Sequence, residues 1–337
     1  MQVKRLAAAL VALAPLYAAA QTNVTLYGVV DAAIESADQG GSIGRHTNVQ
    51  SGNQSGSRFG FRGAEDLGNG VKAIFNLEAG VAADTGAQDA AGLFQRRAVV
   101  GLEGDFGTLT LGREYSPLAQ VAGASDEFGQ GFYGNNLSAF DNGLTRRLSN
   151  SINFKSASFG GVDVMAAYSA GEKTTSPSNN IIAWGAEFKQ GGLYVGGAYQ
   201  TRKAAVAGDT KEYGVGAGYT FADLGGFEIK SNYLAADPIG DNNTFKQYNL
   251  GVGYPFGASK VYANVQQSKI GSSAKGNAWA LAYSYTLSKR TNLYATYASL
   301  NNNAAGAFTL KSGSNAVAPA AAGNDPSVFT VGVRHTF

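Results

Sequence analysis

The chain has 337 residues, with 46 glycines, 44% hydrophobic residues, only 15% charged residues and no cysteine. Without cysteine no disulfide can stabilise it, and this glycine-rich, charge-poor composition favours many strands over helices. With 26 basic and 24 acidic residues the chain is close to neutral, which argues against nucleic-acid binding and leaves any charge selectivity to local arrangement.

The first twenty residues form a separate unit. Lys4 and Arg5 precede an apolar run over residues 6–16 and a stretch of alanines. The run is too short for a membrane helix, which needs about 20 residues, but this order is typical of a secretory signal peptide. We therefore expect a signal peptide over residues 1–20 and an exported barrel over 21–337, with 24 basic groups balancing 24 acidic ones. Beyond the signal no apolar run approaches helix-spanning length, so a membrane role requires strands.

From residue 23 onward the chain reads as a succession of strands. In residues 213–221 and 329–337, large apolar side chains alternate with mostly small or polar ones. One face therefore meets an apolar environment, and the other lacks both a core of large side chains and the Lys and Glu of a soluble sandwich's solvent face. We predict sixteen strands, near residues 23–35, 55–64, 71–81, 93–104, 107–114, 146–157, 160–169, 181–189, 192–201, 212–221, 226–236, 244–254, 259–269, 277–286, 291–300 and 327–337.

The connections between these strands alternate in length. Short turns, as at 105–107 and 222–225, take turns with longer polar loops, as at 40–54, 171–180 and 301–326. An even strand number with this sorting of loops is what an up-and-down outer-membrane barrel requires. Aromatic residues near the short turns are typical of an interfacial girdle, although cross-strand pairs would explain individual contacts. These aromatics are Phe154, Phe159, Phe188, Tyr194, Phe221, Phe227, Tyr254 and Phe256.

The segment from Tyr115 to Thr145 shows neither strand nor helix periodicity, although strands flank it. A loop of that length is uncommon in a compact domain and is usually functional. It carries Asp126, Glu127 and Asp141. We expect it to fold into the lumen and narrow it, with its acids facing arginines of nearby strands, namely Arg58, Arg96, Arg97, Arg146 and Arg147.

The direction of the arginine side chains follows from energetic cost. An arginine that faces lipid costs roughly 2 to 4 kcal/mol at mid-membrane, so these side chains should face the lumen. Phe59 and Phe61 on the outer face put Arg58 and Arg62 inside.

The same argument applies to the strand that follows the loop. Leu148 and Ile152 share the outer face, which puts Arg147 in the lumen. Arg96 and Arg97 are adjacent, so they cannot both point inward from a regular strand, and parity does not say which one does.

Five stretches carry a further signal: Asn23-Val-Thr-Leu-Tyr-Gly-Val-Val-Asp, Ser57-Arg-Phe-Gly-Phe-Arg-Gly-Ala-Glu-Asp-Leu-Gly-Asn-Gly, Arg97-Ala-Val-Val-Gly-Leu, Phe106-Gly-Thr-Leu-Thr-Leu-Gly-Arg, and Val331-Gly-Val-Arg-His-Thr-Phe. Together they resemble the Gram-negative general porins, particularly those of β-proteobacteria. The resemblance implies an outer-membrane homotrimer of 16-stranded antiparallel barrels, each with a long third loop folded into the lumen. It also implies that Phe337 is an assembly signal for the insertion machinery, with membrane lipid and lipopolysaccharide as neighbours.

The resemblance also implies a site. Wall arginines face acids of the inward loop in that family, and Gly123 stands where some cation-preferring relatives carry a second carboxylate, which favours an anion-preferring pore. Carried over to this chain, the wall arginines are Arg58, one of Arg96 and Arg97, and Arg147, and the loop acid is Glu127.

We therefore predict a water-filled channel for passive diffusion of small hydrophilic solutes and ions, weakly anion-selective. The rivals are a substrate-selective channel and an outer-membrane enzyme or adhesin with a plugged barrel; the arginines could also merely solvate the wall or tether the loop. With only His46 and His335 and no cysteine, we expect no enzyme and no catalytic, cofactor or metal residues. The predicted constriction comprises Arg58, Arg62, Arg96, Arg97, Arg147, Asp126 and Glu127.

Overall fold

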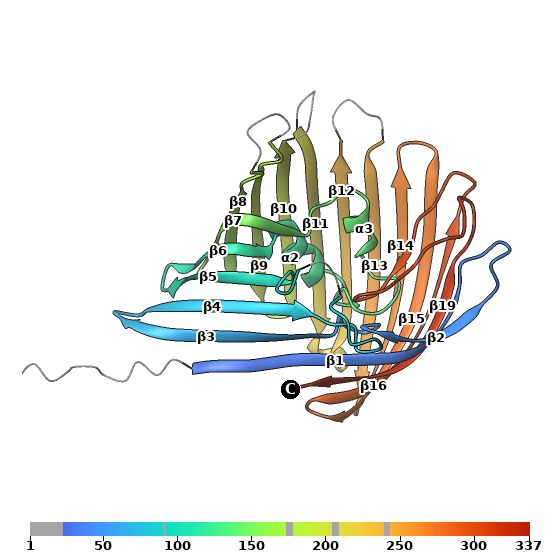
Figure 1. Ribbon diagram of the computed structural model, residues 1–337, viewed down its shortest axis with the longest axis horizontal. Helices are drawn as coiled ribbons and strands as arrows, with labels where there is room; N and C mark the ends of the chain where they lie inside the picture. The colour runs from blue at the N-terminus through green and yellow to red at the C-terminus, as the bar shows by residue number, and fades with distance from the viewer. Residues whose placement is uncertain (1–22, 90–91, 173–177, 204–208, 239–242) are drawn as a thin grey trace, which may run out of the picture.

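The computed structural model describes residues 23–89, 92–172, 178–203, 209–238 and 243–337, most of them in strands (Figure 1). Neither α2 (Pro117–Ala124) nor α3 (Ser138–Asp141) is long and apolar enough to cross a membrane. A single 3-10 turn, η1 (Ala222–Leu224), precedes β12. The strands are β1 (Asn23–Asp38), β2 (His46–Ser51), β3 (Arg58–Gly68), β4 (Val71–Gly80), β5 (Arg97–Gly104), β6 (Gly107–Tyr115), β7 (Arg147–Ser156), β8 (Val162–Ser169), β9 (Ile181–Gln190), β10 (Leu193–Lys203), β11 (Asp209–Phe221), β12 (Phe227–Asp237), β13 (Phe245–Phe256), β14 (Ser259–Ile270), β15 (Ala274–Ser288), β16 (Thr291–Asn302), β17 (Leu310–Lys311), β18 (Ala316–Val317) and β19 (Ser327–Thr336).

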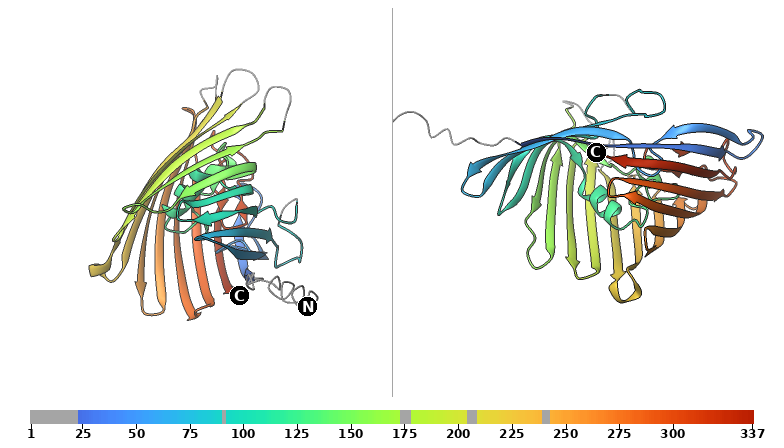
Figure 2. Two further views of the ribbon diagram at one scale, coloured as in Figure 1. Left: turned by 90° about the vertical axis from the view of Figure 1, so that its left-hand side faces the viewer. Right: turned by 90° about the horizontal axis from the view of Figure 1, so that it is seen from below.

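The strands form one antiparallel sheet that closes on itself through the pairing of β1 with β19. The sheet holds 17 labelled strands, but β2 and β3 pair with successive parts of β1 and share one position. The described part of the chain is therefore a closed barrel of 16 strands, which confirms the predicted fold class (Figure 2). Closure leaves no unpaired sheet edge, as a strand-built membrane protein requires.

Two segments that were predicted to be loops contain regular structure. Residues 46–51 form β2, because they pair with the C-terminal half of β1. Within the long loop, Ser116 caps α2 by accepting a hydrogen bond from the Ala119 N–H at 3.1 Å, and Pro117 follows at the first helical position. Ser followed by Pro is a helix-start signal that does not depend on long-range periodicity.

Large side chains on the strands face outward, and small or polar ones face inward. Phe329, Val331 and Val333 are 43 to 48% exposed, whereas Thr330 between them is 1% exposed. Aromatic rings gather at the short turns as predicted, with Phe221 and Phe227 5.8 Å apart between ring centroids.

Tyr194 is an exception among the aromatics expected in the girdle. It is buried, and its hydroxyl donates to Glu187 Oε1 at 3.0 Å. Its neighbours Leu193 and Val195 are exposed, so alternation along β10 places Tyr194 on the inner face.

The prediction that Leu148 shares the outer face of β7 is wrong. Leu148 is 1% exposed and belongs to an inner cluster, whereas Ile152 is 51% exposed. Asn150 between them has a φ of 51°, and the ladder to β6 shifts register at this level. A bulge changes the face on which neighbouring side chains lie, so Leu148 points inward, while Arg147 at the first position of the strand still lines a cavity beside Arg146. The cluster comprises Leu148, Ala167, Ile181 and Ala183.

Candidate functional site

The segment between β6 and β7 leaves its own wall and packs against β8 to β14. Asn232 of β12 donates to the Ser125 carbonyl at 2.9 Å, and Asn264 of β14 donates to the Gly134 carbonyl at 2.6 Å. Leu118 on α2 is fully buried. Figure 2 shows α2 on the concave side of the sheet. One side of the segment is therefore held tightly by the far wall.

Glycines of the far wall make room for the segment. A Cβ atom on Gly216 would overlap Ser125 Oγ, and one on Gly251 would lie 2.6 Å from Glu127 Cβ. Neither approach is compatible with a side chain at the glycine position. The inward glycines of β11 and β13 thus seat the segment, in addition to easing the curvature of the strands.

The acids of the segment lie away from the predicted arginines. The side chain of Glu127 is fully buried, with Oε1 2.9 Å from Lys260 Nζ and Oε2 3.8 Å from Lys230 Nζ. Asp141 pairs with Lys311 at 2.9 Å. Both acids therefore meet lysines, and in the described ranges no group of three or more His, Cys, Asp or Glu side chains is arranged to hold a metal ion.

Asp126 is fully buried within the segment and braces the turn that follows it. Its carboxylate accepts hydrogen bonds from the Gln130 N–H at 2.8 Å and the Phe128 N–H at 3.3 Å. Burial raises the pKa of Asp126 from 3.8 to about 6, and these hydrogen bonds oppose the shift. Asp126 is therefore a part of the internal structure of the segment and contacts none of the arginines.

The raised pKa of Asp126 predicts that the segment loosens as the pH rises. Between about pH 4 and 6 the folded state holds a proton that the unfolded state has lost, so the free energy of unfolding falls through this window by roughly 3 kcal/mol at most. Hydrogen-exchange protection of the Gln130 amide should fall between pH 4 and 7 in the wild type. The Asp126→Asn variant should lack this fall, while Asp141→Asn, whose carboxylate is half-exposed, should retain it.

Arginines from β3 and the start of β5 converge on an acid of the wall. Glu78 on β4 contacts Arg58 Nε at 3.5 Å and Arg96 Nε at 2.8 Å through its two oxygens. Arg97 Nε donates to Glu114 Oε2 at 2.7 Å. Arg96 and Arg97 reach the same cavity, because Arg96 precedes the regular part of β5. Glu78 was not predicted, since nothing in the sequence distinguishes it from other strand acids.

Tyr115 joins two more arginines to this group. Its hydroxyl accepts from Arg147 Nη2 at 2.7 Å, and the guanidinium carbons of Arg147 and Arg146 lie 4.6 and 5.5 Å from its ring centroid. Burial lowers the pKa of Arg146 to about 10, so it stays charged at neutral pH. The buried Nε of each of these arginines lacks a hydrogen-bond partner among the described residues. Arg62 instead stacks over Tyr27 at 5.1 Å and does not line the cavity.

Three cavities follow one another along this wall. The first, of about 410 Å³, shares Arg96 and Arg146 with the second, of about 420 Å³. The second shares Arg97, Tyr115 and Gln120 with the third, of about 320 Å³. Because neighbouring cavities share lining residues, they lie in succession between the segment and β3 to β8.

The connection between β16 and β19 also lies over these cavities. It was predicted to be a polar outer loop, but its Phe308 is buried and its Lys311 carbonyl accepts from the Gly134 N–H at 3.2 Å. The Ser314 N–H donates to the Gly52 carbonyl at 3.0 Å. The apolar residues in this loop were the signal for its packing.

The chain is similar to known proteins over its whole length. Residues 7–305 match the family model described as Gram-negative porin. It is 33% identical to outer membrane porin protein 32 of Delftia acidovorans, covering 97% of this chain and 99% of that one, and 31% identical to an outer membrane porin protein of Bordetella pertussis, covering 100% of both. It superimposes on the anion-selective porin from Comamonas acidovorans with a TM-score of 0.85 and 29% identity, covering 94% of this chain and 100% of that one. Porins are channels rather than enzymes, and this chain belongs to the Gram-negative porin family of the outer membrane.

Proposed function

We propose that this porin is a passive diffusion channel for small hydrophilic solutes and ions that prefers anions, and that the segment between β6 and β7 forms its constriction. The observation that carries the proposal is the chain of cavities between the segment and the opposite wall. Five arginines and two lysines line these cavities against two glutamates and two aspartates, and residues 116–145 of the segment bring no charged side chain to the second cavity. The lining residues that matter are Arg58, Arg96, Arg97, Arg146, Arg147, Glu78 and Glu114 on the wall, and Gln120, Gly123, Ala124, Gly129 and Gln130 on the segment.

The excess of arginine creates a positive potential along the path. Two like charges about 4 Å apart repel by roughly 1 kcal/mol in water and about 4 kcal/mol at an effective dielectric of 20. Glu78, the Tyr115 ring, Asp89 beside Arg96 and Glu114 beside Arg97 relieve only part of this repulsion. A charged lining of this kind concentrates counter-ions and rejects ions of its own sign. The anion-selective porin that shares 29% of its sequence with this chain supports the same assignment.

The proposal extends to the biological unit. We include a homotrimer, contact with lipopolysaccharide, and recognition of the terminal Phe337 by the outer-membrane assembly machinery. Phe337 closes the ladder by exchanging backbone hydrogen bonds with Gly28, both at 3.1 Å, and its ring is 44% exposed. The predicted signal peptide over residues 1–20 lies outside the described residues.

The test is a single-channel recording in a planar lipid bilayer, followed by the reversal potential across a potassium chloride gradient. Discrete conductance steps are expected, with a reversal potential shifted toward the equilibrium potential of chloride. If a correctly folded protein gave no conductance steps, the barrel would be plugged and the proposed channel function would be overturned. Conductance steps with a reversal potential shifted toward the equilibrium potential of potassium would overturn the anion preference but not the channel function. Liposome swelling with sugars, amino acids and phosphate then separates a general pore, which admits all three, from a substrate-selective one.

A further inference from the structure

The tip of the segment between β6 and β7 turns through a left-handed pair of residues. Gly129 and Gln130 have φ angles of 59° and 58°, and the Gly131 N–H donates to the Phe128 carbonyl at 2.9 Å. Positive φ at both central positions is typical of a type I′ turn, where Asn, Asp and Gly are the usual residues. Glutamine is unfavourable in this conformation, because only Gly and the short polar side chains adopt it readily. Such an outlier points to a role for the Gln130 side chain.

The Gln130 side chain connects the tip of the segment to Arg146, which directly precedes β7. Its Oε1 accepts a hydrogen bond from Arg146 Nη2 at 2.9 Å, and its Nε2 donates to Asn136 Oδ1 at 3.1 Å. Asn136 is fully buried, and its own Nδ2 donates to the Ala122 carbonyl at 2.8 Å. A chain of hydrogen bonds therefore runs from the guanidinium through two amides to the backbone of α2.

The groups at the two ends of this chain fix the orientation of both amides. A guanidinium can only donate hydrogen bonds, and a backbone carbonyl can only accept them. Turning either amide around would set two donors or two acceptors against each other. The oxygen of Gln130 therefore points at Arg146, and its nitrogen points at Asn136.

Neutral groups hold Arg146. Besides its hydrogen bond to Gln130, its guanidinium carbon lies 5.5 Å from the centroid of the Tyr115 ring. Arg96, in contrast, forms an ion pair with Glu78 at 2.8 Å. In the part of the chain that the structure describes, the ion pairs of arginine do not include Arg146. An amide oxygen orients a guanidinium but, unlike a carboxylate, cancels none of its charge.

We propose that Gln130 is a specificity-determining residue of the pore, and that its amide holds the Arg146 guanidinium in place without neutralising it. Small anions in the second cavity, which both residues line, then meet a positive charge of fixed position. A carboxylate at residue 130 would cancel that charge, and a shorter side chain would release the guanidinium. This role of Gln130 rests on the proposed anion-preferring channel, and it gives the segment a part in the selectivity.

The first measurement is the reversal potential of Q130E in a planar bilayer across a potassium chloride gradient. Glutamate has the shape of glutamine, so its carboxylate should pair with Arg146 and cancel the charge. One unit charge within about 4 Å of an ion changes the local concentration of that ion about fivefold in water. The chloride-to-potassium permeability ratio should therefore fall about fivefold. An unchanged ratio in an anion-preferring pore would overturn the role of Gln130 alone, whereas a wild type without anion preference would overturn the proposed function and this role with it.

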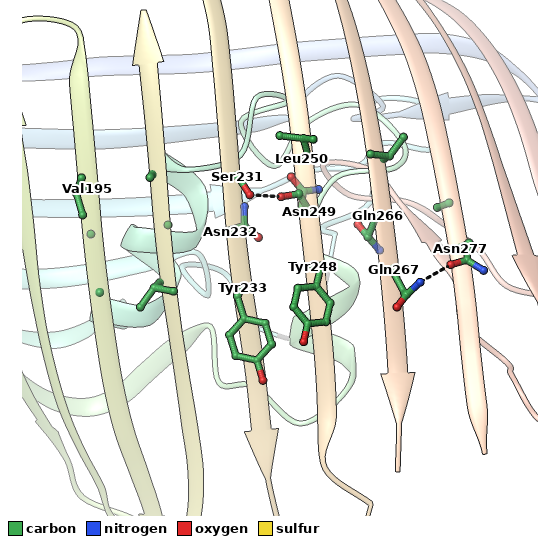
Figure 3. Close-up of a pocket in the computed structure, with 17 residues that line it drawn as sticks. Val195, Ser231, Asn232, Tyr233, Tyr248, Asn249, Leu250, Gln266, Gln267 and Asn277 are labelled. Carbon is green, nitrogen blue, oxygen red and sulfur yellow. Dashed lines mark hydrogen bonds between the residues drawn. The ribbon is translucent and has the colours of Figure 1, made fainter. Parts of the chain in front are cut away.

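Q267E is the matched control, because it makes the same chemical change on the outer face of the barrel. Gln267 lies two residues after the exposed Val265 in β14, so alternation places both side chains outside. Figure 3 shows Gln267 beside Asn277, and its Nε2 donates to Asn277 Oδ1 at 2.8 Å. The permeability ratio of Q267E should equal that of the wild type. A fall as large as that in Q130E would mean that the net charge of the protein sets the ratio, and would also overturn the role of Gln130.

A second measurement separates the hold on Arg146 from a merely structural part in the turn. Q130G removes the amide but suits the left-handed backbone, so the turn should be retained. The freed guanidinium should move within the pore and raise the open-channel current noise, while the reversal potential keeps its sign. In the R146Q background, Q130G should add no noise, because there is no guanidinium to release. Equal increases in both backgrounds, or no increase in either, would overturn the hold on Arg146.

Discussion

Replacing Arg58 and Arg146 together by glutamate should convert an anion-preferring channel into a cation-preferring one. Both side chains line the second cavity, and Arg146 also lines the first, so the double change replaces two positive charges by two negative ones on the path itself. Charged clefts change local ion concentrations by roughly tenfold or more. The reversal potential across a potassium chloride gradient should therefore change sign.

The matched control makes the same change in net charge at positions away from the cavities. Arg45→Glu with Arg290→Glu alters the net charge equally, but Arg45 lies in an exposed loop, where it pairs with Asp38, and Arg290 lies in an exposed turn. The reversal potential of this control should have the same sign as that of the wild type. Arg58→Gln with Arg146→Gln should give an intermediate potential, because it removes the positive charges without adding negative ones. If the glutamate variant forms conducting channels with an unchanged potential, the arginines do not set the selectivity.

The barrel could be predicted from the sequence because its strands repeat one local rule. Large apolar side chains at every second position are required wherever one face meets lipid, so the pattern survives in each strand separately. The rule failed at Leu148, where the bulge at Asn150 changes parity without any local signal. The alternation rule holds at Tyr194, but the assignment of this residue to the aromatic girdle failed, because its ring lies on the inner face and its hydroxyl donates to Glu187 on the neighbouring strand.

The site was less predictable, because charge pairing depends on contacts distant in sequence. Of the predicted arginines, Arg58, Arg96, Arg97 and Arg147 line the cavities and Arg62 does not. Glu127 was expected opposite them and lies between Lys230 and Lys260 instead. Each of these residues occurs in an ordinary sequence context. Only the placement of the segment against the far wall decides that Glu127 meets lysines and that Glu78 meets arginines.

The two sides of the segment therefore have different tasks. The side toward β9 to β14 is packed on glycines and held by side-chain amides, whereas the other side faces the cavities. Under the proposed function, the width of the pore should depend on how closely the segment approaches its seat. Adding a single atom at the seat should therefore change the distance between the segment and the arginines of the opposite wall, although no arginine contacts the seat.

The Gly216→Ala substitution tests this dependence and should lower the single-channel conductance. The added methyl would overlap both Oγ and Cβ of Ser125, so the segment must move away from β11 and toward the arginine wall. Overpacking of this kind costs about 1 to 3 kcal/mol. The reversal potential should keep its sign, because no charge is changed.

Two further variants make the result specific. Gly197→Ala adds the same methyl to the neighbouring strand, but on the outer face, where the nearest atom is 3.7 Å away, and should leave the conductance unchanged. Ser125→Gly in the Gly216→Ala background removes both atoms that the methyl meets and should restore the wild-type conductance. Recovery in the double variant would show that the segment, and not the strand, sets the width of the path. A conductance that stays wild-type in Gly216→Ala would mean that the segment does not control the path, because the clash at its seat would then have no effect on ion flow.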